Sequence, residues 1–239
     1  MTQSNTLDNP TRCVHCGAPG PLSDDHIPPK NLYTAPRPSN LITVPACESC
    51  NAGAAKDDEY FRLALSMRRE AEANPRAIDA STKSLRGLSR TESSGFRAQF
   101  LNDVVYAWQE SEDSRLLIHD IVGYTAEFSR LDRVVKRLVT GFFFHNVGRR
   151  LPDSHSAHAW TLEGLHGTPG WEKAENILRI LQSRPVIPVG IQDVFFYRYM
   201  LFDEDPNASL WLFVVFGSTG FIGLTMPRDR PSRPRIVLP

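Results

Sequence analysis

The stretch from Cys13 to Lys56 reads CVHCGAPGPLSDDHIPPKNLYTAPRPSNLITVPACESCNAGAAK, and the rest of the chain is organised around it. Two Cys-x-x-Cys pairs bracket it, Cys13 with Cys16 and Cys47 with Cys50. The stretch is rich in proline and poor in apolar residues, so we do not expect it to fold on a hydrophobic core alone. A bound metal ion would supply the missing cross-link.

The two pairs predict a structural zinc site. Thiolates bind zinc tetrahedrally, and a gap of two residues lets both sulfurs of a pair reach one ion. The 30 residues between Cys16 and Cys47 exceed the usual spacing of about 15 to 20, so the intervening segment must itself be organised. Four sulfurs leave no open position on the ion and predict an exposed His15. Two disulfides are the alternative reading of the same cysteines.

Length and composition set limits on the protein class. The chain has 239 residues, 41% apolar and 23% charged, which suits one large domain or a small domain followed by a larger one. Its net charge of zero argues against a broadly basic nucleic-acid binder, and a nuclease of this composition would have to concentrate its positive charge locally. The polar start carries no signal-peptide pattern, and no apolar run approaches the roughly 18 residues that span a bilayer. We therefore expect a cytoplasmic protein with no membrane partner, in which paired cysteines favour metal over disulfide.

Inside the bracketed stretch, one ordered set of residues carries a family resemblance. These residues are Asp25-His26-Ile27-x-Pro29, then Asn40-Leu41, then Cys47-x-x-Cys50-Asn51, and finally Lys56. In this order they resemble the HNH endonucleases, also called ββα-metal or His-Me finger nucleases, over about residues 13–61. The layout is similar to that of the members in which two Cys-x-x-Cys pairs flank the Asp-His motif. An Asp-His dipeptide alone would carry no such information.

The resemblance implies a small zinc-stapled ββα-metal module that hydrolyses phosphodiester bonds, with DNA as the expected substrate. His26, neutral near pH 7, would accept a proton from the attacking water. Asp25 and Asn51 would hold one divalent cation that stabilises the leaving oxygen. The family often has histidine where this chain has Asn51. Oxygen-only ligation favours Mg or Mn over Zn at this catalytic position.

Two further roles come from the resemblance. Asn40 would orient the His26 imidazole from the second strand of the module. Lys56 would contact a phosphate as a point charge, about a turn and a half along the helix that follows Asn51. These two residues join His26 as the predicted catalytic set.

Each assignment has an alternative reading. The alternatives are Asp24 in place of Asp25 as the ligand, Asp25 as an Asx-turn residue, His26 as a structural histidine, Asn40 as a turn cap, Asn51 as a residue at the start of a helix, and Lys56 as a solvated lysine.

The remainder of the chain predicts an α+β domain with an antiparallel meander. The module itself has a short strand over 41–44 and a helix over 49–69. Residues 100–108 and 116–122 read as strands, although the first reads equally well as helix. We expect helices over 125–150 and 171–183, and meander strands over 194–202, 210–217 and 221–227. The resulting division is a flexible tail (1–12), a zinc-bound HNH nuclease domain (13–73), a linker (74–95) containing a helical turn or two, an α+β domain of unknown role (96–227) and a basic Pro-rich tail (228–239).

Three functional hypotheses follow. The first is a Mg- or Mn-dependent endonuclease that binds and cuts DNA. The second is a catalytically inactive zinc module that binds nucleic acid or protein. The third is a nuclease whose larger domain senses a regulatory protein or ligand. The segment from Arg130 to Arg150, with six basic residues and one acidic residue, and the segment from Arg228 to Arg235 are the electrostatic candidates for nucleic-acid contact. A solvated helix face is the alternative reading of the first segment.

Overall fold

The structure, a computed structural model, describes residues 11–90, 94–102, 104–110 and 117–228. Within these ranges the chain is a mixed α+β protein whose sheets are all antiparallel. The predicted N-terminal tail up to residue 10, part of the predicted linker (91–93) and the basic tail from residue 229 onward lie outside the described residues.

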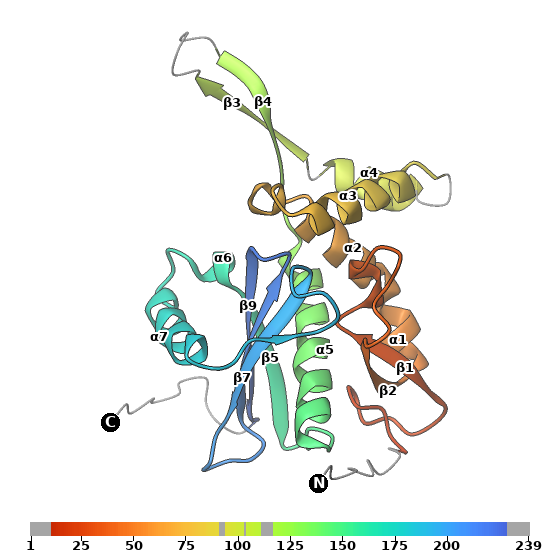
Figure 1. Cartoon of the computed structure of the whole chain (residues 1–239), viewed down its shortest axis with the longest axis vertical. Coiled ribbons are helices and arrows are strands. Elements are labelled where there is room, and N and C mark those ends of the chain that lie inside the picture. The colour runs from red at the N-terminus through yellow and green to blue at the C-terminus, as the bar shows by residue number, and fades with distance from the viewer. Residues whose placement is uncertain (1–10, 91–93, 103, 111–116, 229–239) are drawn as a thin grey trace.

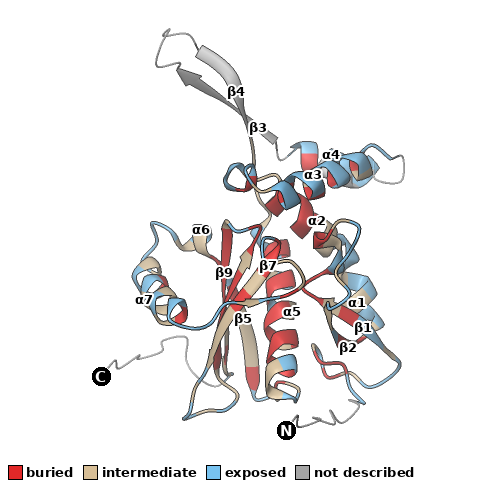
Figure 2. Cartoon of the chain, in the orientation of Figure 1, coloured by how far each residue is buried: buried red, intermediate tan, exposed pale blue. Residues whose placement is uncertain are grey.

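Helix α5 (Phe128–Val147) is the central element, and it lies between a β-hairpin and the largest sheet (Figure 1). Its apolar residues recur at helical spacing and are buried along most of its length (Figure 2). Phe128 at its start is exposed over 47% of its surface, and Val147 at its end is partly buried. Gly148 ends the helix in a left-handed conformation with φ of 80°, which lets its N–H donate to the Phe144 carbonyl at 2.8 Å. The helix expected over 125–150 is confirmed with both ends shortened.

The five-stranded sheet has the order β5-β9-β8-β7-β6, and it packs against α5. Its two faces can be followed along β8. Trp211 and Phe213 point into the cluster that contains α5, whereas Leu210 and Leu212 pack in a separate cluster with Leu181 of α7. The predicted meander is confirmed, and β5 and β6 extend it beyond the prediction. The elements are β5 (His155–Thr161), α6 (Leu162–Leu165), α7 (Trp171–Gln182), β6 (Ile187–Pro188), β7 (Phe195–Leu201), β8 (Ser209–Val215) and β9 (Thr219–Pro227).

The cysteine-bracketed stretch forms a β-hairpin followed by a helix on the other side of α5 (Figure 1). Gly141 of α5 permits the contact, because a Cβ at that position would lie 2.8 Å from Ile27 Cγ2. The helix expected over 49–69 is interrupted soon after it begins, where weak helix-forming residues such as Gly53 follow the second cysteine pair. The elements are β1 (Leu22–Ile27), η1 (Lys30–Leu32), β2 (Ile42–Cys47), α1 (Glu48–Asn51), η2 (Ala52–Ala54), α2 (Ala55–Ser66) and η3 (Arg69–Ala71).

Residues 74–95, expected to be mainly a linker, contain the well-formed helix α3 (Pro75–Leu88). Asn74 caps its start by accepting hydrogen bonds from the Arg76 and Ala77 amides at 2.9 and 3.3 Å. The helix packs on α2 through a face made largely of alanine and serine. Small side chains make a weak apolar signal in a sequence, which explains why the prediction stopped at a turn or two.

Two further elements resolve the ambiguity over residues 100–108. Helix α4 (Ser94–Asn102) ends before β3 (Val104–Glu110), which pairs with β4 (Leu117–Tyr124). Figure 1 shows this hairpin extending away from the rest of the molecule.

The predicted nuclease domain and the predicted α+β domain share one hydrophobic core. A single cluster of buried residues joins Ile27 and Val44 of the first hairpin to Phe142 of α5 and Trp211 of β8. Tyr33, on the loop between β1 and β2, also donates a hydrogen bond to the Val189 carbonyl at 2.6 Å. The hairpin is therefore held by the rest of the chain as well as by its cysteines. Among the described helices, none combines the length and the apolar composition that a membrane-spanning segment requires.

Candidate metal centre and active site

The four cysteines come together at one end of the first hairpin. Cys13 and Cys16 lie in the turn before β1, Cys47 ends β2 and Cys50 lies in α1. Their Sγ atoms all lie within 4.8 Å of one another, and Cys16 Sγ is 3.6 Å from Cys47 Sγ. Tetrahedral zinc–thiolate bonds place sulfurs about 3.8 Å apart, so the donor set fits one zinc ion. All four cysteines are free thiols, which contradicts the two-disulfide alternative.

The thiols of this cluster also differ in acidity. The hydrogen bond with Ser49, aided by the backbone of Cys50, lowers the pKa of Cys47 to about 6. Burial raises the pKa of Cys50 and that of Cys16. Crowded sulfurs do not all ionise without a cation between them, and this behaviour fits a site that is completed by a metal ion.

His26 and Asp25 project from opposite faces of the hairpin. In the β1–β2 register, His26 lies opposite the exposed Thr43, whereas Asp25 lies opposite the buried Val44. Neighbouring residues of a strand alternate between its faces. Asp24 therefore shares the face of His26, and Asp25 shares the buried face of Ile27.

The His26 imidazole is half-buried, and no side chain or backbone group among the described residues hydrogen-bonds to it. Burial lowers its pKa, and the positive charges of Lys30 and Arg37 add to this effect. Asp25 and Asp24 oppose the shift by favouring the charged form. The net lowering keeps His26 neutral at pH 7, as proton abstraction requires.

The Asp25 carboxylate is held by an ion-pair network. Arg137 of α5 places its Nη2 atom 2.9 Å from Asp25 Oδ1 and 3.0 Å from Oδ2. His15 Nε2 lies 3.0 Å from the same Oδ2. Arg137 also reaches Asp58 Oδ1 at 2.7 Å. Asp25 is 3% exposed, so this predicted metal ligand lies inside the protein with both oxygens in hydrogen bonds.

His15 corrects a second expectation. Its side chain is 5% exposed rather than solvated, and Nδ1 lies 2.7 Å from the hydroxyl of Thr140 on α5. Sequence reasoning missed the roles of His15, Asp58 and Arg137. No local pattern could have found the link through Arg137, which lies 112 residues from Asp25 and 79 from Asp58. His15 is only 10 residues from Asp25, but its other partner, Thr140, is 125 residues away.

Asn51 lies against the first strand of the hairpin. Its Nδ2 donates to Ser23 Oγ at 2.8 Å and to the Asp24 carbonyl at 3.1 Å. These bonds leave Asn51 Oδ1 without a donor among the described residues. The Asn51 amide, which the sequence predicts to hold a divalent cation, therefore lies beside Asp24. Asp24 is the chain neighbour of Asp25, the other predicted ligand.

Asn40 and Lys56 are both exposed. Asn40 precedes β2, and no hydrogen bond joins it to His26 among the described residues. Lys56 lies in the first turn of α2, where its backbone carbonyl accepts a hydrogen bond from Arg130 at 2.8 Å. Their assigned roles, orientation of the imidazole and contact with phosphate, stay predictions.

Most of the basic residues between Arg130 and Arg150 bond to other groups of the chain. Asp57 of α2 accepts hydrogen bonds from Arg130 at 3.0 Å and from Arg133 at 2.7 Å. Burial alone would raise the pKa of Asp57, but the bonds from Arg133 and Arg130 outweigh it and lower that pKa. Arg149 donates to Asn207 Oδ1 and to the Pro206 carbonyl. The run that suggested nucleic-acid contact is thus largely a set of links to the hairpin module and the sheet.

No family model matches the chain, and comparisons with curated proteins and with solved structures found no similar protein. The resemblance to the HNH endonucleases therefore rests on the ordered motif, and the activity it implies is a proposal.

Proposed function

We propose that the chain is a metal-dependent endonuclease that hydrolyses DNA phosphodiester bonds with His26 as general base. The observation that carries the proposal is the hairpin-then-helix unit built on the four-cysteine cluster. Its first strand presents a half-buried His26 and its first helix ends at Asn51. This arrangement is the one that the ordered sequence motif leads us to expect.

The surroundings of His26 suit an anionic substrate. Lys30 and Arg37 are exposed, they lower the pKa of His26, and neither has an ion-pair partner among the described residues. Unpaired cations beside the base would attract a phosphodiester and compensate part of its charge. This local charge answers the objection raised by a net charge of zero.

The donors near His26 fit a hard divalent cation such as Mg or Mn. Asn51 Oδ1 has no other donor among the described residues, and carboxylates are present at positions 24 and 25. The ion would act as a Lewis acid on the scissile phosphate. Asp25 becomes a ligand only if Arg137 releases one of its oxygens, whereas Asp24 is exposed on the face of His26.

A plasmid-nicking assay with Mg or Mn tests the proposal. Zinc-loaded wild type should convert supercoiled DNA to nicked or linear forms, and His26→Ala should abolish cleavage while keeping its zinc. His166→Ala is the matched control, because His166 is exposed and its ring contact is with Trp171 of α7. Cleavage by His26→Ala at the wild-type rate would rule out the assigned base.

A second assay decides which carboxylate holds the ion. If Asp25 is the ligand, Asp25→Asn should raise the Mg concentration needed for half-maximal nicking and Asp24→Asn should not. If Asp24 is the ligand, Asp24→Asn should raise that Mg concentration and Asp25→Asn should not. Far-UV circular dichroism and zinc content on both variants separate lost ligation from lost folding.

A second candidate function is a catalytically inactive zinc module that binds nucleic acid or protein. The Asp25–Arg137 pair favours it, because both oxygens of the predicted metal ligand are already hydrogen-bonded. This candidate predicts DNA binding with no cleavage under any divalent ion, and binding that is unchanged in His26→Ala.

A further inference from the structure

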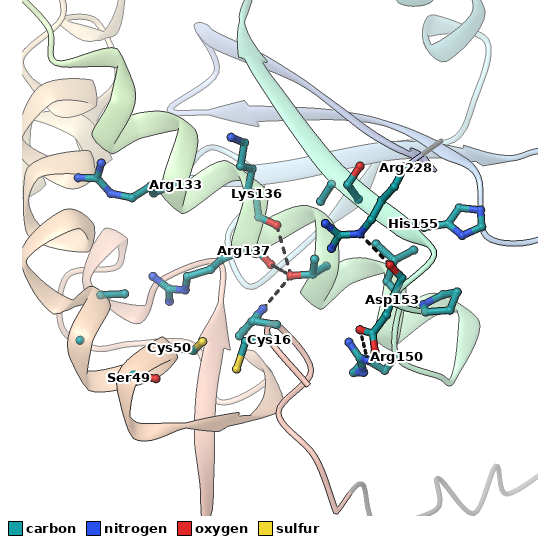
Figure 3. A pocket seen from close by; sticks show the side chains of 18 of the residues that line it. Cys16, Ser49, Cys50, Arg133, Lys136, Arg137, Arg150, Asp153, His155 and Arg228 are labelled. Atoms are coloured by element: carbon teal, nitrogen blue, oxygen red, sulfur yellow. Dashed lines mark hydrogen bonds and ion pairs between the residues drawn. The ribbon is translucent and has the colours of Figure 1, made fainter. Parts of the chain in front are cut away.

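A pocket of about 820 Å³ lies where the cysteine cluster meets α5 and the start of β5 (Figure 3). Figure 3 shows three groups of side chains around it. Arg133, Lys136 and Arg137 come from α5, and Cys16, Ser49 and Cys50 come from the module. Arg150, Asp153, His155 and Arg228 complete the wall from the segments that flank β5 and follow β9.

The pocket is lined by five cationic side chains and two acidic ones. The cations are Arg133, Lys136, Arg137, Arg150 and Arg228, and the acids are Asp57 and Asp153.

Three of these cations form ion pairs with carboxylates of the same chain. Arg133 pairs with Asp57, and Arg150 pairs with Asp153. Arg137 pairs with Asp25 and Asp58, which do not line the pocket. These guanidinium groups therefore hold the pocket together, and little of their charge is left for an occupant.

Lys136 and Arg228 differ from the other three. Both are exposed, and neither has a carboxylate within ion-pair distance among the described residues. Arg228 Nε donates to the backbone carbonyl of Asp153 at 2.7 Å, a bond that positions the guanidinium without cancelling its charge. Lys136 belongs to α5 and Arg228 directly follows β9, and both line the same pocket.

The zinc centre limits where an anion can sit. With a zinc ion held by its four thiolates, the cysteine cluster would carry a net charge of about −2, and Cys16 and Cys50 form one wall of the pocket. That charge would repel an anionic group from the cysteine wall, and the cations of the other two walls would attract it. An anionic occupant would therefore place its charged end at Lys136 and Arg228.

We propose that this pocket binds a small phosphate-bearing molecule whose phosphate groups contact Lys136 and Arg228. The volume lies within the range of about 300 to 1,000 Å³ that small-molecule sites occupy. Clustered ammonium and guanidinium donors are the usual partners of phosphate oxygens. Ser49, Gly53 and Ala54 on the module side are small and leave room for the rest of the ligand.

An occupant would also touch the segment that carries Asn51. Ser49, Cys50, Gly53 and Ala54 of that segment line the pocket. Asn51, which lies between them in the chain, reaches back to β1. A ligand could therefore influence cleavage, an extension that rests on the proposed nuclease function. The binding itself needs no nuclease activity, so a direct binding measurement separates the two ideas.

Calorimetric titration of the zinc-loaded chain with pyrophosphate, without added divalent ion, tests the proposal. We expect one equivalent to bind, and Lys136→Glu or Arg228→Glu to weaken binding by about tenfold or more, since each removes a charged hydrogen-bond donor. Lys136→Arg should retain binding. Lys173→Glu, at an exposed position on α7 away from the pocket, is the matched control and should bind as wild type does.

A parallel titration with a single-stranded oligonucleotide distinguishes a small ligand from a nucleic-acid strand. Oligonucleotide binding that depends on Lys136, together with no binding of pyrophosphate, would overturn the small-ligand proposal. So would pyrophosphate binding that is unchanged in both glutamate variants. Zinc content and thermal unfolding of each variant confirm that a lost signal reflects the pocket and not a lost fold.

Discussion

Arg137 and Asp25 form a buried ion pair that fastens the cysteine-bracketed module to the central helix. The guanidinium Nη2 lies 2.9 Å from Asp25 Oδ1 and 3.0 Å from Oδ2, and the two residues are 112 positions apart in the chain. The same guanidinium reaches Asp58, so one cation bridges the hairpin, α2 and α5. Burial alone would lower the pKa of Arg137, but the charges of Asp58 and Asp25 outweigh it and raise that pKa.

Removing the guanidinium leaves two carboxylates without their cation. We expect Arg137→Met to reduce the free energy of unfolding by about 3 to 5 kcal/mol, since an uncompensated buried charge remains. Urea denaturation of the zinc-loaded protein at pH 7 measures this. Arg133→Met is the matched control, because that side chain is 55% exposed and its pair with Asp57 should contribute less than about 1 kcal/mol. Equal losses in the two variants would show that the Asp25–Arg137 pair does not fasten the module.

The zinc site should control the folding of the hairpin. We expect about one zinc per chain by elemental analysis, and Cys50→Ser should lose it, because three thiolates and a hydroxyl bind zinc less tightly. Thermal unfolding should then occur at a lower temperature, since binding energy of a structural zinc is also folding energy. Adding zinc back after chelation should restore the wild-type transition but not that of Cys50→Ser. Wild-type protein that contains no zinc and unfolds at an unchanged temperature after chelation would contradict the assignment.

The contact between Gly141 and Ile27 predicts a steric effect. A Cβ at position 141 would lie 2.8 Å from Ile27 Cγ2 and 2.9 Å from Ile27 Cδ1, so the hairpin must shift or the side chain must change rotamer. Overpacking of this kind costs about 1 to 3 kcal/mol, against a gain of about 1 kcal/mol from replacing glycine in a helix. We expect Gly141→Ala to be neutral to destabilising and Gly141→Val to be clearly destabilising in urea unfolding. Ile27→Val should partly rescue both.

Gly53→Ala provides the comparison for this steric effect. Its Cβ would meet a backbone oxygen at an ordinary 3.9 Å, so the substitution should not destabilise the protein. A Gly141→Val variant as stable as wild type would mean that the hairpin does not pack on α5 at this point.

Local patterns in the sequence predicted the parts of the fold that depend on local physics. The spacing of Cys13, Cys16, Cys47 and Cys50 predicted their cluster, and apolar periodicity predicted α5 and the meander. Helix α3 was mostly missed because its inner face is alanine and serine, although Asn74 followed by proline is a helix-start signal. The strand β5 was missed because HSAHAWT alternates only weakly in hydropathy.

In the candidate site, too, the local contacts follow from the sequence motif and the long-range contacts do not. Which residues surround His26 follows in part from the motif, since Asp25 and Asn51 lie in or beside the same hairpin. The link from Asp25 to Arg137, and the buried position of His15, depend on how α5 packs against β1. That packing is set by contacts such as Gly141 with Ile27, more than 100 residues apart, which no local window contains.

The pH dependence of cleavage tests the environment of His26. Burial and the charges of Lys30 and Arg37 lower the pKa of His26 from its usual 6.5, so the neutral imidazole persists to lower pH. A general base must be unprotonated, so kcat/KM for nicking should be constant near pH 7 and fall as the pH drops through that lowered pKa.

Lys30→Gln removes one of the charges that disfavour the imidazolium, so it should raise the pKa of His26. The acidic limb of the profile should then move to higher pH, while Lys173→Gln on α7 should leave the limb in place. A limb that lies above pH 7 in the wild type, or one that does not move in Lys30→Gln, would mean that a group other than His26 accepts the proton. Loss of rate at all pH values without a shift of the limb would instead assign Lys30 to phosphate binding.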